Sequence, residues 1–293
     1  MVQRFAVALL LGGALLAAGC SSLKVAYGNA ETIAWWWLDG YVDFERDQKP
    51  AAKAALSSWL AWHRRTQLPQ YRQWLQQTAV LMQGTPSGEQ ICARIEAADP
   101  LRAQALAPLA QPVAELAPRL RPAQLAHLEK RFADKNAEWS EKHLQRDPQQ
   151  RREAQAKRAI ENTERFYGRL DREQRRWLTL RLQASPYRAE NDLSERQLRQ
   201  RDAVATLRTL AEPALSAEQV RRISAAWIER LANPVDRPHA EARDAARHYL
   251  CELAADFHRE QATPTQRRHL AEVLQGWQRD IDGFLQPTAA APS

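Results

Sequence analysis

The stretch that decides the fold lies near the end of the chain: Thr263 to Leu285 reads TPTQRRHLAEVLQGWQRDIDGFL. Its apolar side chains recur at Leu270, Val273, Leu274, Trp277, Ile281 and Leu285. Steps of three and four residues place them on one stripe of an α-helix. Thr263, three residues before Gln266, has the spacing of a capping box, in which each side chain bonds the other residue's backbone amide. The stretch predicts a long capped helix that packs against a core.

The same periodicity runs through the rest of the chain, as at Leu125, Leu128 and Phe132. No stretch shows the alternating, β-branched pattern that is typical of a strand. Pairs such as Asp147-Pro148 interrupt the helical runs with turn chemistry. The sequence therefore predicts an all-α, multi-helix bundle of about eight to ten helices. We expect residues 29–285 to form a single domain and residues 286–293 to form a frayed tail.

Cap residues followed by glutamine recur elsewhere, at Asp171/Gln174 and at Ser216/Gln219, with a degenerate copy that ends at Gln124. Two explanations are open, namely similar helical units or merely similar helix starts, and the second is favoured because the flanking residues do not align. The motif resembles the leucine-threonine-x-x-glutamine signature of small periplasmic stress chaperones. That resemblance implies a chaperone-like role.

The N-terminus has the layout of a bacterial lipoprotein signal. One positive charge at Arg4 precedes the apolar run Phe5 to Leu16, and small residues precede Cys20. The run is too short to span a bilayer, so residues 1–19 are predicted to be a cleaved signal peptide and Cys20 to carry the lipid. A plain secretory signal with a chance cysteine is the alternative. Ser21, where aspartate would favour the inner membrane, favours the periplasmic leaflet of the outer membrane.

Residues 20–28 are expected to be a lipidated tether, which when fully extended would reach about 30 Å, at roughly 3.3 Å per residue. So short a tether would keep the domain close to the membrane, its first expected partner. The triplet Trp35-Trp36-Trp37 follows at once. Successive helical residues point about 100° apart, so three rings cannot share one face. Either the helix is buried all round, which is favoured, or one ring meets the membrane interface.

Cys92 and Cys251 remain once Cys20 is set aside, and an even pair in an exported protein favours a disulfide. By chain entropy such a bridge would contribute roughly 5 kcal/mol at most. Two buried free thiols are the alternative.

The formal charge is +7, and the surplus is local. From Arg146 to Arg208 there are sixteen Arg and Lys against ten Asp and Glu. Nucleic acid is excluded as a partner for an exported protein, whereas an acidic envelope protein or an anionic glycolipid such as lipopolysaccharide fits the charge. The favoured alternative is a solvated helical surface whose acids pair with the arginines.

Polar side chains suited to chemistry gather in one predicted helical hairpin, at Asp39, Asp43, His63, Arg64 and Arg65. A carboxylate-oriented His63 could act as a general base. A structural network of ion pairs with a buried His63 is favoured, because no nucleophile accompanies it. No catalytic residue is therefore assigned. The histidine spacings match no metal motif, and neither a metal nor a cofactor is expected.

Longer segments resemble a known family. They are Ser22-Leu-Lys-Val-Ala-Tyr27, Trp36-Trp37-Leu38-Asp39-Gly40-Tyr41, Leu60-Ala-Trp62-His63-Arg64-Arg65, Leu68-Pro69-Gln70-Tyr71 and the helix that begins at Thr263. Together they resemble an uncharacterised proteobacterial lipoprotein family, domain of unknown function 6279. The resemblance implies a lipid anchor and a helical fold but no activity.

The expected function is thus a non-enzymatic binding, scaffolding or chaperone-like role in the cell envelope. Two alternatives are an envelope enzyme that uses the Asp39/His63 region and a binder of anionic lipid or lipopolysaccharide that uses residues 146–208.

Overall fold

The structure is a computed structural model, and it describes residues 21–233 and 236–286. Of this part of the chain 84% is helical and none is strand, which confirms the all-α prediction. Joined across their short breaks, the helices within these ranges number eleven, close to the expected eight to ten.

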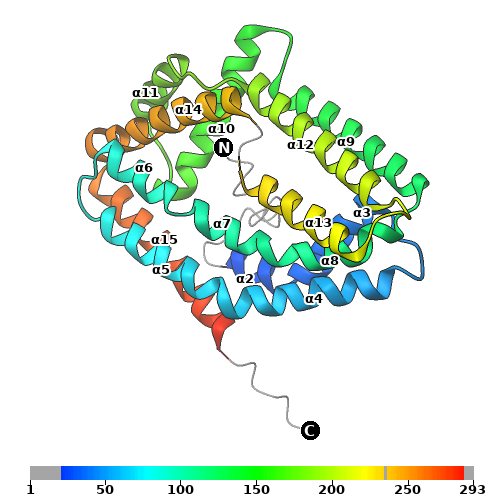
Figure 1. Ribbon diagram of the computed structural model, residues 1–293. Helices are drawn as coiled ribbons and strands as arrows, with labels where there is room; N and C mark the ends of the chain where they lie inside the picture. The colour runs from blue at the N-terminus through cyan, green and yellow to red at the C-terminus, as the bar shows by residue number, and fades with distance from the viewer. Residues whose placement is uncertain (1–20, 234–235, 287–293) are drawn as a thin grey trace.

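The helices follow one another with short connections (Figure 1). The α-helices are α2 (Ser21–Gly28), α3 (Ala30–Val42), α4 (Lys49–Thr66), α5 (Leu68–Leu81), α6 (Gly88–Glu96), α7 (Asp99–Leu106), α8 (Ala110–Leu116), α9 (Pro122–His143), α10 (Pro148–Tyr167), α11 (Arg172–Gln183), α12 (Ala189–Leu210), α13 (Ala217–Ala232), α14 (Arg237–Asp256) and α15 (Pro264–Leu285). The proline-rich stretch near α8 holds two 3-10 turns, η1 (Ala107–Leu109) and η2 (Ala117–Arg119), while η3 (Phe257–Gln261) is a π-helical turn.

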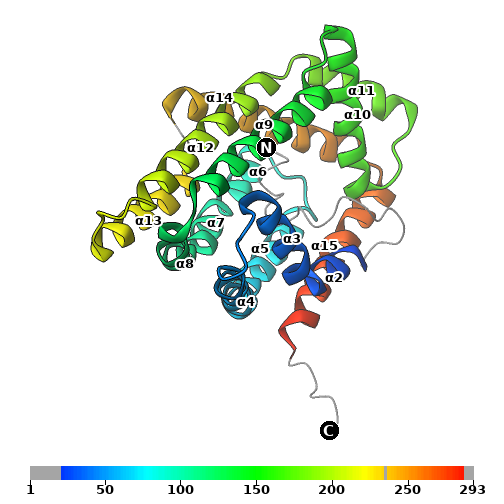
Figure 2. The same cartoon turned by 90° about the vertical axis from the view of Figure 1, so that its right-hand side faces the viewer.

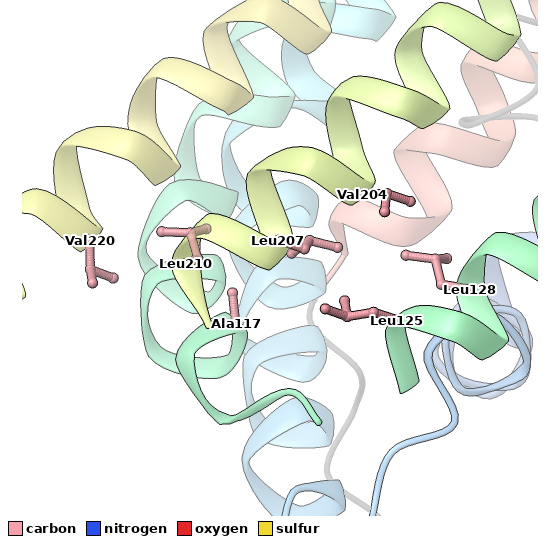
Figure 3. Close-up of a cluster of buried hydrophobic side chains, with 7 residues drawn as sticks. All are labelled: Ala117, Leu125, Leu128, Val204, Leu207, Leu210 and Val220. Atoms are coloured by element: carbon pink, nitrogen blue, oxygen red, sulfur yellow. The ribbon is translucent and has the colours of Figure 1, made fainter. Parts of the chain in front are cut away.

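Several clusters of buried side chains hold the helices together. One lies where α9, α12 and α13 meet around η2, and it contains Ala117, Leu125, Leu128, Val204, Leu207, Leu210 and Val220 (Figure 3). Another lies between α5 and α15 and contains Leu68, Leu75, Leu270, Leu274 and Ile281. The apolar stripe read from the last helix therefore faces α5, as its periodicity requires.

Most of the segment expected to be a tether is helical. Ser21–Gly28 forms α2, and the Tyr27 ring packs against Phe284 of α15 with centroids 4.7 Å apart. Eight helical residues span only about 12 Å, against more than twice that when extended. Residues before 29 therefore pack on the folded domain. Cys20, the signal segment 1–19 and residues 287–293 lie outside the described part.

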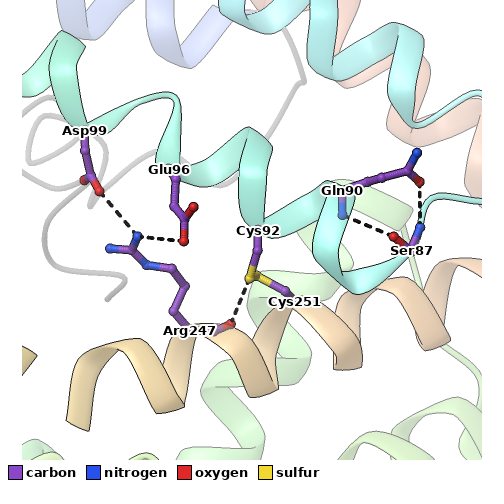
Figure 4. Close-up of a disulfide and its surroundings, with 7 residues drawn as sticks. All are labelled: Ser87, Gln90, Cys92, Glu96, Asp99, Arg247 and Cys251. Atoms are coloured by element: carbon purple, nitrogen blue, oxygen red, sulfur yellow. Dashed lines mark hydrogen bonds and ion pairs between the residues drawn. A yellow bond between two sulfur atoms is a disulfide. The ribbon is translucent and has the colours of Figure 1, made fainter. Parts of the chain in front are cut away.

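The two remaining cysteines are bonded to each other. Cys92 of α6 and Cys251 of α14 form a disulfide with their Cα atoms 5.5 Å apart, and Cys251 is fully buried (Figure 4). Gly88, which begins α6, lies against Glu252 of α14, and a Cβ there would require the Glu252 carboxylate to move. Arg247, one turn before Cys251, bridges Glu96 at 3.5 Å and Asp99 at 3.3 Å.

Within the ranges described, no helix has both the length and the apolar character needed to cross a membrane.

Candidate functional site

The N-terminal helices meet in one corner of the molecule, which holds most of the side chains singled out in the sequence. There α2 and α3 pack against α4, α9 and α15 (Figures 1 and 2). We call α2, α3 and α4 together the N-terminal corner.

His63 is the buried polar centre of this corner. It is 7% exposed, and its Nδ1 lies 3.0 Å from the Tyr27 hydroxyl. Burial lowers the pKa of His63 to about 4, and burial also raises the pKa of Tyr27, although Arg64 opposes that rise. At neutral pH the imidazole is therefore uncharged and the phenol protonated, so a hydrogen bond between two neutral groups joins Tyr27 to His63.

The acids of the predicted network lie elsewhere. Asp39 pairs with Lys49 Nζ at 3.0 Å and accepts a bond from the Phe44 amide at 3.1 Å. His63 follows Lys49 by fourteen residues along α4, which is about 21 Å of helix. The single network expected of Asp39, Asp43, His63, Arg64 and Arg65 is therefore not formed, although His63 is buried as expected.

The other members of that predicted network also have separate roles. Asp43 ends α3 in the left-handed conformation, with φ of 52°. The Arg64 guanidinium lies 5.8 Å from the centre of the Tyr27 ring, and Arg65 is exposed. Because the carboxylates and the imidazole stand at opposite ends of α4, the carboxylate-oriented general base considered for His63 is not assembled.

A pair of buried glutamines fixes the turn between α3 and α4, and the capping motif marks Gln124 but not its pairing with Gln48. Gln48 and Gln124 are 2% and 5% exposed. Gln124 Nε2 donates to Gln48 Oε1 at 2.8 Å and to the Asp43 carbonyl at 2.9 Å. Gln124 is the glutamine of the degenerate capping motif. Its Oε1 accepts from the Arg121 amide at 2.9 Å, but only half a box forms, because a guanidinium cannot accept a bond in return.

The same device recurs at the other end of the molecule. Gln174 Nε2 donates to Gln266 Oε1 at 2.8 Å, and Gln266 Nε2 donates back to Gln174 Oε1 at 2.9 Å. Both residues are also the glutamines of complete capping boxes. The motifs that end at Gln174 and Gln266 therefore join two helix starts, whereas Gln219 bonds to Ser216 within its own cap. The sequence signal was a glutamine that also caps a helix.

The Arg-rich segment does not form one cationic face. Five of its arginines pair with acids, which are Glu190 for Arg151, Glu164 for Arg175, Asp256 for Arg181, Glu195 for Arg199 and Glu129 for Arg208. The segment is also spread over α10 and α11, which lie side by side, and α12, which lies apart from them against α9 and α13 (Figure 2).

The most basic helix of that segment is far from the N-terminal corner. Helix α11 contacts the first turn of α15 through Gln174 and Gln266, whereas α2 contacts its last turn through Tyr27 and Phe284. Eighteen helical residues, about 27 Å, separate these two points of α15. Attraction of α11 to a membrane beside α2 is therefore not supported by the geometry.

The tryptophan triplet divides between the body and solvent. Trp35 turns inward and stacks on Phe44 at 5.8 Å, with Lys53 Nζ 4.9 Å from the centre of the Trp35 ring. Trp36 is 75% exposed and Trp37 52%, so the favoured expectation of burial all round is wrong. Ile33, 36% exposed, lies one turn before them on the same side of α3.

A shallow hollow adjoins Trp36. Its lining consists of Trp36, Asp39, Gly40, Asp43, His127 and Arg131. The Gly40 carbonyl, near the end of α3, accepts bonds from Arg131 Nε at 3.1 Å and His127 Nε2 at 3.2 Å. These two donors satisfy an end carbonyl that helix geometry leaves without a partner in its own helix. Among the residues described, no group of three His, Cys, Asp or Glu side chains could hold a metal ion.

Comparison with known proteins gives one match. The model of a family of unknown function, DUF6279, matches residues 40–219. No curated protein and no solved structure matches the chain.

Proposed function

The chain belongs to DUF6279, a family of unknown function, and we propose that it is a lipid-anchored protein of the cell envelope. In this proposal the lipid is attached at Cys20, and the protein resides at the periplasmic leaflet of the outer membrane. Its helical domain has a non-enzymatic binding, scaffolding or chaperone-like role.

The observation that carries the proposal is the Cys92–Cys251 disulfide. It ties α6 to α14 across 159 residues of sequence. Disulfides of this structural kind persist in oxidising compartments and are rare in the cytosol. An exported location agrees with the signal pattern that ends at Cys20.

The docking of α2 supports the anchor. Ser21–Gly28 is helical and follows Cys20 in the sequence, and Tyr27 contacts both His63 and Phe284. A lipid on Cys20 would then be joined to the body through a docked helix and not through a loose chain. The domain would be held beside the membrane, where a binding or scaffolding role has its components within reach.

The anchor is tested by expressing the full chain in a diderm bacterium and measuring the mass of its N-terminal peptide. We expect a peptide that begins at Cys20 and carries acyl chains, with the protein in the outer-membrane fraction. Cys20→Ala should abolish acylation. Cys92→Ala is the matched control, because it also removes one cysteine but should leave acylation intact. An unmodified N-terminus at another residue would contradict the proposal.

The role is tested on the same lipidated protein by crosslinking in cells followed by affinity purification. A scaffold or adaptor should return one stoichiometric envelope partner. A chaperone should instead return many clients and suppress the aggregation of an unfolded protein in solution. Turnover of a substrate that is lost on His63→Gln would contradict the non-enzymatic proposal.

A further inference from the structure

We infer that the outward face of α3, formed by Ile33, Trp36 and Trp37, inserts into the lipid–water interface of the membrane that carries the anchor. The inference rests on the proposed function and adds to it the surface with which the folded domain meets the membrane. We call these three residues the α3 face.

The α3 face is an apolar surface that the rest of the described chain leaves partly open, with the centroids of the Trp37 and Tyr41 rings 4.7 Å apart. Its residues are spaced at i, i+3 and i+4, so they lie together on one side of the helix. They are 36%, 75% and 52% exposed. Tryptophan carries the largest apolar surface of any side chain and is usually well buried, so two exposed neighbours mark an interaction surface.

The position of the face in the chain identifies its occupant. The proposed acylated residue, Cys20, immediately precedes α2, and Trp37 follows it by seventeen residues. Even if α2 and α3 formed one straight helix, the distance along it from Cys20 to Trp37 would be only about 26 Å. Val25 of α2, 46% exposed, adds apolar surface between the anchor and the α3 face. A membrane that holds the lipid is thus the surface nearest to these rings.

The chemistry of the face fits the interfacial zone of a bilayer. Tryptophan is enriched there because its ring is apolar and its indole N–H can bond to headgroups and water. Helix α3 carries Glu31 and Asp39 and no basic residue. Attraction to anionic lipid is therefore not its source of affinity, and insertion should persist in zwitterionic vesicles and at high salt.

The test uses the full lipidated chain in phosphatidylethanolamine or phosphatidylcholine vesicles that contain a diazirine-bearing phospholipid. After photolysis, mass spectrometry maps the lipid adducts. We expect adducts on the α3 face several-fold above those on Val80 and Leu180, two apolar side chains that are 63% and 55% exposed on other helices. Added salt should not change this ratio.

Matched variants separate insertion from general exposure. Ile33→Gln with Trp36→Gln should remove most adducts from α3. Val80→Gln with Leu180→Gln, which also removes two exposed apolar side chains, should leave the α3 adducts unchanged. Circular dichroism and thermal melting of each variant establish that it is folded. Loss of α3 adducts in both variants, or in neither, would overturn the inference.

The same sample reports separately on the anchor. Acylated Cys20 without adducts on α3 overturns the insertion and leaves the anchor in place. Unmodified Cys20 with α3 adducts overturns the anchor and supports the insertion. Crosslinks between the α3 faces of two copies, in place of lipid adducts, would overturn the insertion in favour of self-association.

Discussion

Two tyrosine–histidine pairs with the same bond length have different places in the molecule. The Tyr27 hydroxyl bonds to His63 Nδ1 in the N-terminal corner, and the Tyr167 hydroxyl bonds to His258 Nδ1 in the C-terminal half, both at 3.0 Å. His258 Nε2 is also 3.1 Å from the Gly84 carbonyl. A carbonyl can only accept, so Nε2 carries the proton and Nδ1 accepts from Tyr167. Both ring nitrogens of His258 thus have hydrogen-bond partners. Within the described residues, the hydrogen bond of the His63 ring is the one to Tyr27.

The surroundings of the pairs explain what each holds. His258 is fully buried in η3, which follows α14, and Gly84 precedes α6. The disulfide already joins α6 to α14 (Figure 4), and Gly84 and His258 lie eight residues before Cys92 and seven after Cys251, so this pair lies beside a covalent link. His63 instead connects α4 to α2, the first described helix. The same hydrogen bond therefore reinforces an interior junction in one place and fastens a peripheral helix in the other.

The largest test of this comparison is removal of the disulfide. Cys92→Ala with Cys251→Ala should lower the free energy of unfolding by up to roughly 5 kcal/mol, because the unfolded chain is no longer closed into a long loop. Hydrogen exchange should rise in α6, α14 and η3 and stay unchanged in α2. Chemical denaturation measures the first effect. Equal deprotection of α2 would show that the two regions are not independent.

Loss of a histidine ring should affect the two pairs unequally. His258→Ala leaves the Gly84 carbonyl and the Tyr167 hydroxyl without a partner and opens a cavity, and should cost roughly 4 kcal/mol. His63→Ala leaves one partner near the surface and should cost about half of that. The two variants are compared by urea denaturation. Costs in the reverse order would refute the distinction between interior junction and peripheral fastening.

Acidification should weaken the His63 pair. The pKa of His63 is lowered to about 4 in the folded protein, against about 6.5 when unfolded. Below pH 6.5 the unfolded state binds a proton that the folded state does not, so stability falls as the pH drops towards 4 and changes no further below it. The full effect is about 3 kcal/mol at most, from about 1.4 kcal/mol per pKa unit.

The control for this titration is His63→Gln, which should show a shallower loss of stability between pH 7 and 4. His143 and His258, whose pKa values burial also lowers, supply a background of the same sign in both proteins. The difference between the two curves isolates His63. Parallel curves would mean that His63 does not contribute.

The smallest effect is expected from the phenol that holds α2. Tyr27→Phe removes one hydrogen bond and should cost about 1 kcal/mol. Hydrogen exchange should increase in α2 but not in α4. Tyr167→Phe is the matched change, and it should cost more because the Nδ1 that it leaves unpaired belongs to a fully buried ring. Increased hydrogen exchange in α2 for Tyr167→Phe and not for Tyr27→Phe would contradict the role of Tyr27 in holding α2.

Local features of the structure were predictable from sequence. Asp171/Gln174, Ser216/Gln219 and Thr263/Gln266 all form the capping boxes that their spacing predicts. A further capping box, at Ser87 and Gln90, has the same spacing. Such caps involve residues within one helical turn, so the nearby sequence contains all that they need. The cysteine pairing was accessible for a different reason, since only two candidates remained.

The partners of distant side chains were decided by tertiary structure. Asp39 pairs with Lys49 and not with His63, because Lys49 and His63 lie near opposite ends of α4. Gln124 meets Gln48 because α9 lies against the turn before α4. Trp36 is exposed and Trp35 is not, because only one side of α3 faces the body. By itself the sequence determined where helices form and how they are capped, since those interactions lie within a few residues. Which side chains are buried, paired or exposed depended on how helices far apart in the chain pack together, and only the folded structure contains that arrangement.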